Sequence, residues 1–157
     1  MAVLLTDKAV LMRAVLTGGA VAGTVDVFAA ALINRVDPRI VLQAIASGAL
    51  GKAAFTGGAS TMVLGFVLQI IMSIIIAAIF LAAATKFDLL RWPILSGALY
   101  GVGVYCVMTY VVVPLSQARA NYPASLSAAL PDLAAMMVFG LIIALTPGFL
   151  GYGATRR

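Results

Sequence analysis

Four long stretches of apolar residues, separated by shorter polar segments, dominate the chain. They cover residues 14–33, 59–84, 94–113 and 133–152. A helix needs about 20 residues to cross about 30 Å of hydrocarbon, and each stretch has that length. The stretches lack the alternation of a membrane β-strand, and an open strand would leave backbone groups unpaired in lipid. The pattern predicts an all-α polytopic membrane protein whose four transmembrane helices form an up-down bundle.

The connection between the first two stretches has a periodic pattern of its own. Asp37 followed by Pro38 is typical of a helix N-cap and first helical residue. Residues 38–51 then alternate between a polar and an apolar side with helical spacing. The polar residues of this segment and its end are Arg39, Gln43, Ser47 and Lys52. A helix of this length cannot cross the bilayer, so it is predicted to lie in the interface or to enter the membrane as a re-entrant segment.

The composition also indicates a lipid environment. Hydrophobic residues make up 64% of the 157 residues and charged residues only 10%, against about 25% charged in soluble domains. The chain has no His and no Glu, and Cys106 is its single cysteine. These absences remove the usual ligands of haem, zinc and copper and any Ser–His or Cys–His pair, so we expect no metal, no cofactor and no enzymatic activity.

The ten basic residues lie mainly beside the apolar stretches, where positive charge orients membrane proteins. Six of the ten fall on the cytoplasmic side if both termini are cytoplasmic, which favours that orientation. Trp92, Tyr100 and Tyr110 fit aromatic anchors near the ends of spans. The net charge of +5 is spread along the chain, so nucleic-acid binding is not expected.

The two halves of the chain, residues 10–84 and 90–153, are faintly alike. LTGG at residues 16–19 aligns with LSGA at 95–98, and MVLGFVL at 62–68 aligns with MVFGLII at 137–143. A tandem duplication would place both copies in the same orientation, related by an axis along the membrane normal. The shared richness in Gly, Ala, Leu and Val is the alternative explanation, and the sequence leaves both open.

Asp26 is the most informative side chain because it lies deep in the first apolar stretch. An acid near the bilayer centre costs about 2.5–3.5 kcal/mol on insertion scales, so it should face protein or water. Helical spacing brings other polar side chains to similar depths. The predicted intramembrane polar centre consists of Asp26, Gln69, Ser73 and Tyr105. It is either a protonatable or cation-binding site, or a set of hydrogen bonds that fixes helix packing.

Small residues recur at three- and four-residue steps in all four stretches, and such stripes let membrane helices approach closely. The predicted helix-packing residues are Gly19, Gly23, Gly65, Gly97, Gly101, Gly140 and Ala144.

Three runs of sequence resemble a known group of proteins. They are GGAVAGTVD at residues 18–26, VLQAIASGALGKAAF at 41–55 and YVVVPL at 110–115. Together they are similar to a group of small, uncharacterised bacterial inner-membrane proteins with four spans, with a more distant likeness to YagU-like inner-membrane proteins. The resemblance implies a four-span bacterial membrane protein and carries no catalytic residues to this chain.

Three functions remain in competition. The leading hypothesis is an accessory or scaffolding subunit that packs in the lipid bilayer against other membrane proteins or as a homo-oligomer. The alternative is a small transporter or channel that uses Asp26 as its protonatable or cation-binding group, with Gln69 beside it. The third, an enzyme acting on lipids through Asp132, Asp37 or Lys52, has no supporting spacing.

Overall fold

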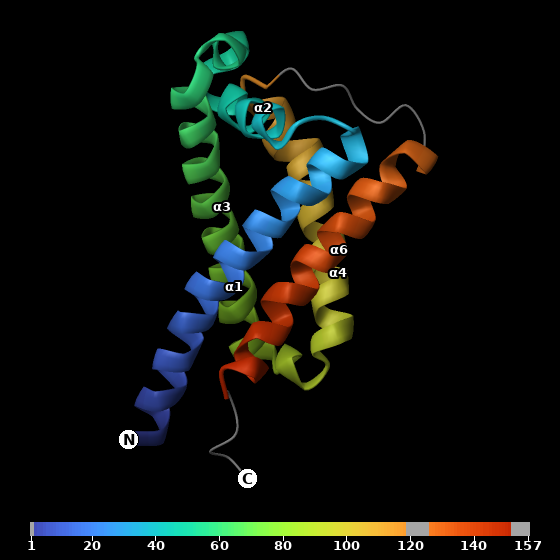
Figure 1. Cartoon of the computed structure of the whole chain (residues 1–157). Coiled ribbons are helices and arrows are strands. Elements are labelled where there is room, and N and C mark those ends of the chain that lie inside the picture. Colours follow the sequence, from blue (N-terminus) through green and yellow to red (C-terminus); the bar gives the residue numbers. More distant parts are fainter. Residues whose placement is uncertain (1, 119–125, 152–157) are drawn as a thin grey trace.

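The computed structural model describes residues 2–118 and 126–151, with side chains over 8–118 and 129–151. Within these ranges every regular element is a helix (Figure 1). In chain order the elements are α1 (Ala2–Asn34), α2 (Pro38–Leu50), η1 (Gly51–Thr56), α3 (Gly58–Phe87), η2 (Leu89–Arg91), α4 (Pro93–Val107), η3 (Met108–Val112), α5 (Val113–Leu115) and α6 (Leu126–Phe149). The chain runs along α1, back along α3, again along α4 and back along α6 (Figure 1).

Four helical segments are long and apolar enough to cross a membrane: Lys8–Asn34, Gly58–Phe87, Pro93–Leu115 and Ala129–Phe149. The prediction of an all-helical chain with four such segments is therefore confirmed, and it indicates a multi-pass membrane protein. Each segment agrees with one of the apolar stretches of the sequence, and the differences lie at the ends.

The end of the third span differs from the sequence prediction, which stopped at Pro114. The helix continues to Leu115 through the wider π-helical turn η3. In this turn the Val113 amide donates to the Met108 carbonyl, five residues back. A proline inside an α-helix clashes with the carbonyl four residues earlier, and a π-turn changes that spacing. The helix therefore includes Pro114 and ends one residue later, at Leu115.

The start of the fourth helix also differs. The sequence places Pro131 and Asp132 before the span, but α6 already begins at Leu126 and includes both residues. Pro131 lies in the second turn of α6, where its missing N–H removes one backbone hydrogen bond while the rest of the helix continues. As a result Asp132 belongs to the helix and to its packed surface.

The connecting helix α2 forms where the sequence predicts it. The Asp37 side chain accepts a hydrogen bond from the Arg39 amide at 2.7 Å, and Pro38 occupies the first turn. At the other end, Gly51 adopts a positive φ of 60°, which ends α2 and leads into η1. α2 packs across α3 at Gly65, where an added Cβ would collide with the Leu42 carbonyl.

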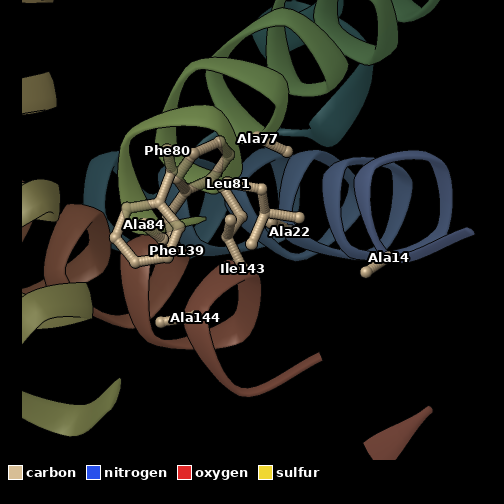
Figure 2. Packing of buried hydrophobic residues seen from close by; sticks show 9 residues of the cluster. All are labelled: Ala14, Ala22, Ala77, Phe80, Leu81, Ala84, Phe139, Ile143 and Ala144. Atoms are coloured by element: carbon tan, nitrogen blue, oxygen red, sulfur yellow. The ribbon is translucent and has the colours of Figure 1, made fainter. Parts of the chain in front are cut away.

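The spanning helices pack in the order α3, α1, α6, α4. A core of alanines and a few large side chains joins α1, α3 and α6, with Phe80 and Leu81 from α3 meeting Phe139 and Ile143 from α6 (Figure 2). The full cluster is Ala14, Ala22, Ala77, Phe80, Leu81, Ala84, Phe139, Ile143 and Ala144. Consecutive helices α3 and α4, by contrast, are not among the closely packed pairs.

Candidate functional site

The Asp26 side chain of α1 is half-buried and faces α3. Its Oδ2 accepts a hydrogen bond from the Gln69 amide nitrogen at 2.9 Å. The same nitrogen donates to the Gly23 carbonyl at 3.2 Å, so one buried amide joins a side chain and the backbone of α1. The structure thus brings together two of the four residues in the predicted polar centre.

Ser73, the third predicted member, lies one turn beyond Gln69 on α3. Its hydroxyl donates to the Gln69 carbonyl at 2.7 Å, within α3 rather than across to Asp26. The side chain is buried against Gly23, where an added Cβ would collide with Ser73. Ser73 therefore belongs to the α1–α3 contact and supports the polar pair from beside it.

Tyr105, the fourth predicted member, lies on α4 and makes no hydrogen bond to the other three among the described residues. The antiparallel register of α4 and α6 determines its level. Gly101 of α4 packs on Met136 and Met137 of α6. Because the two helices run in opposite directions, a residue four positions after Gly101 lies beside a residue about four positions before Met136. Tyr105 is therefore level with Asp132.

Asp132 is the residue of this region that the sequence did not predict as part of the polar centre. It lies on α6, which packs against α1, the helix that carries Asp26. Pro131 suggested a helix boundary at this point and so placed Asp132 outside the span. With α6 beginning at Leu126, the described residues hold two acids in the spanning helices, Asp26 on α1 and Asp132 on α6.

The predicted helix-packing residues lie at contacts within the chain. Gly19 and Gly23 face α3, and an added Cβ at Gly19 would be 2.8 Å from the Ile74 Cα. Gly97 and Gly101 face α6, where Gly140 and Ala144 approach the α4 backbone. Gly65 faces α2 instead, although the proposed repeat equates it with Gly140. These small-residue faces are filled by the chain's own helices.

The polar residues of α2 do not form a single wetted face. Arg39 is exposed and its side chain reaches Asp37 at 4.0 Å. Gln43 is half-buried against α3 and donates a long hydrogen bond of 3.5 Å to Thr61. Ser47 is buried and donates to the Ala44 carbonyl at 2.6 Å. The polar stripe turns partly into the protein, while apolar residues of α2 such as Ile40 are exposed.

An apolar groove of about 440 Å³ lies between α3 and α4. It is lined by Met72, Ile75, Ile76 and Ile79 from α3 and by Tyr100, Gly103, Val104, Val107, Met108 and Val112 from the third span. At the end nearer η2, the Tyr100 hydroxyl donates to the Ile76 carbonyl at 2.8 Å, and its ring contacts Phe80 with centroids 4.9 Å apart. Tyr100 therefore links α3 to α4.

Gly103 distinguishes this groove from the packed faces. An added Cβ at Gly103 would meet no atom within 4 Å, whereas at Gly101, two residues earlier, it would collide with the Met136 backbone. Gly103 is the one glycine away from the helix ends that faces open space in the described spans. The groove thus presents a small residue in the middle of an apolar surface.

The chain was also compared with known proteins. No family model, curated protein or solved structure matches it. The likeness to small four-span bacterial membrane proteins stays a prediction. The function therefore has to be inferred from the chain's own geometry.

Proposed function

We propose that the protein is a membrane-embedded accessory or scaffolding subunit that packs against a transmembrane helix of another membrane protein or of a second copy. In this proposal the chain lies in a bacterial inner membrane as an up-down bundle with both termini in the cytoplasm. α2 is embedded at the outer interface, with its apolar residues towards lipid. The docking site is the groove between α3 and α4.

The open space at Gly103 is the observation that carries this proposal. Association of membrane helices has no hydrophobic driving force and depends on close packing, which small residues allow. The other small-residue faces already hold helices of the same chain, so they are not available to a partner. Gly103 combines a small residue, a surrounding apolar wall and free space. Met72 and Met108 in that wall have flexible side chains that can adjust to a partner.

Site-specific photocrosslinking in the native membrane tests this proposal. A photoreactive side chain at Val107, in the groove, should give one discrete adduct, and its mass identifies a second copy or another subunit. The same group at Val63, which is exposed outside the groove, is the matched position and should give none. Gly103→Phe should fill the groove and abolish the Val107 adduct, while Ala82→Phe on the exposed side of α3 should leave it. Equal adducts from Val107 and Val63, or no adduct at all, would refute the docking site.

A second candidate function, a small transporter or channel, is favoured by one observation. Asp26 on α1 and Asp132 on α6 both lie in segments long and apolar enough to cross a membrane, on two helices that pack together. Like charges repel in a medium of low dielectric constant, and a bound cation or proton would relieve the repulsion. Gln69, an uncharged hydrogen-bond donor, would then hold the Asp26 carboxyl in position.

Flux measurements in liposomes decide this second candidate. Asp26→Asn keeps the size of the side chain and removes its charge. The transporter hypothesis expects proton or cation flux in the wild type and its loss in both Asp26→Asn and Asp132→Asn. Absence of flux in the wild type, or equal flux in the variants, would contradict it.

A further inference from the structure

A polar pocket lies beyond the end of the groove, on the side of α2. It is lined by Leu50, Gly51, Lys52, Ser116 and Gln117 and has a volume of about 570 Å³. Its walls are held together by hydrogen bonds between segments far apart in the sequence. The backbone N–H of Gln117 donates to the Gly48 carbonyl at 3.0 Å, and the side-chain Nε2 of Gln117 donates to the Ala49 carbonyl at 2.9 Å. The end of α2 and the residues after α5 are thus joined at the rim of the pocket.

Lys52 gives this pocket a positive charge. The described part of the chain holds a single ion pair, between Arg39 and Asp37, so no acid there neutralises Lys52. Among the described residues that line the pocket, the other polar side chains are those of Ser116 and Gln117, neither of which carries charge. A ligand that complements the pocket is therefore an anion.

The polar pocket and the apolar groove are neighbours along the third span. Val112 lines the groove and Ser116 lines the pocket, four residues further along. At 1.5 Å per helical residue this separates them by about 6 Å. A cationic pocket and an apolar groove this close together on the third span match a molecule that has an anionic head and a hydrocarbon chain.

We propose that this surface binds an anionic phospholipid of the bilayer. The phosphate lies in the pocket beside Lys52, and one acyl chain lies along the groove between α3 and α4 past Gly103. The inference rests on the proposed function in one respect, because the lipid occupies the docking groove when no partner helix does. A partner helix must then displace the acyl chain of the lipid, so anionic lipid regulates docking in the groove.

The apolar groove is the reason for assigning a lipid rather than a soluble phosphate. A free anion would use only the exposed charge of Lys52, and an exposed charge attracts weakly in water. The acyl chain of a lipid would also fill the groove and contact its apolar walls. Close packing of this kind stabilises contacts inside a bilayer. Both parts of the site are used only when head and chain belong to one molecule.

Native mass spectrometry of the purified full chain, released from nanodiscs, tests the proposal. The nanodiscs contain equal amounts of phosphatidylglycerol and phosphatidylcholine with identical acyl chains. Because one Lys near the membrane surface contributes about 1 kcal/mol towards anionic lipid, we expect the wild type to retain phosphatidylglycerol about fivefold in preference. Lys52→Gln should remove this preference, while Lys86→Gln, the same change at an exposed position on α3 outside the pocket, should preserve it.

A second variant tests the contribution of the acyl chain separately from that of the phosphate head group. Gly103→Phe fills open space in the groove, so it should lower the retention of both lipids. In the wild type, soluble glycerol phosphate should not displace the bound lipid, because it has no acyl chain. Preference unchanged in Lys52→Gln, or retention unchanged in Gly103→Phe, would overturn the lipid site. Lys52→Gln leaves the walls of the groove intact, so the Val107 crosslink to a partner should survive it. Failure of the lipid proposal is therefore distinguishable from failure of the docking proposal.

Discussion

The two sides of α4 differ sharply although they are built from the same helix. On one side Gly97 and Gly101 lie so close to α6 that an added methyl group would collide with its atoms. On the other side Gly103 faces open space towards α3, the helix that precedes α4 in the chain. A short connection therefore does not ensure close packing, and the spacing of small residues decides which helices meet.

The largest expected effect comes from changing the closed side. Gly101→Leu would force a side chain into the Met136 backbone, which cannot move aside as a flexible side chain can. Overpacking of this kind costs about 1–3 kcal/mol, and a backbone obstacle puts it at the upper end. Gly103→Leu, two residues away, should change the free energy of unfolding by less than about 0.5 kcal/mol. Unfolding in bicelles by steric trapping measures both, and equal effects would remove the distinction between the two sides.

A medium effect is expected where α1 meets α3. Gln69→Leu removes the donor to both the Asp26 carboxyl and the Gly23 carbonyl. Hydrogen bonds between membrane helices contribute about 0.6 kcal/mol on average, so losing two while leaving an acid unpaired should cost about 1–2 kcal/mol. Gln43→Leu is the control, because its single bond to Thr61 is long at 3.5 Å. A loss in Gln43→Leu as large as in Gln69→Leu would contradict this ranking.

The smallest effect is expected at the open side. Tyr100→Phe deletes the hydrogen bond to the Ile76 carbonyl but keeps the ring contact with Phe80. We expect a loss of about 0.6 kcal/mol and greater mobility between α3 and α4. Spin labels on the two helices would show this as a broader distance distribution. An unchanged distribution would mean that Tyr100 does not hold the open side together.

Much of the fold could be predicted from the sequence because lipid leaves the backbone few alternatives. Four apolar runs of sufficient length have to be helices, and Asp37 with Pro38 marks the start of α2 by local chemistry alone. The pairing of Asp26 with Gln69 was also predictable, since an acid in a span needs a polar neighbour and Gln69 lies at the right depth.

The rest depended on tertiary contacts that periodicity does not encode. Pro131 suggested a boundary before the fourth span, yet it lies within α6, so Asp132 is part of a spanning helix, which was not predicted. The groove was not predicted, because apolar periodicity alone does not show which spans leave space between them. Gly103 carried a signal in principle, since it lies about 160° around the helix from Gly101 and about 120° from Gly97.

Oxygen accessibility of a spin label at Val107 tests the central claim that the α3–α4 groove is open to the bilayer. The label is placed in a Cys106→Ser background, in liposomes dilute enough to keep chains apart, with Val63 as the lipid-exposed reference. An open groove predicts access to dissolved oxygen comparable with Val63 and little access to a water-soluble nickel chelate. Low oxygen access, as at a packed helix contact, would show that α3 and α4 close on each other and would contradict the account.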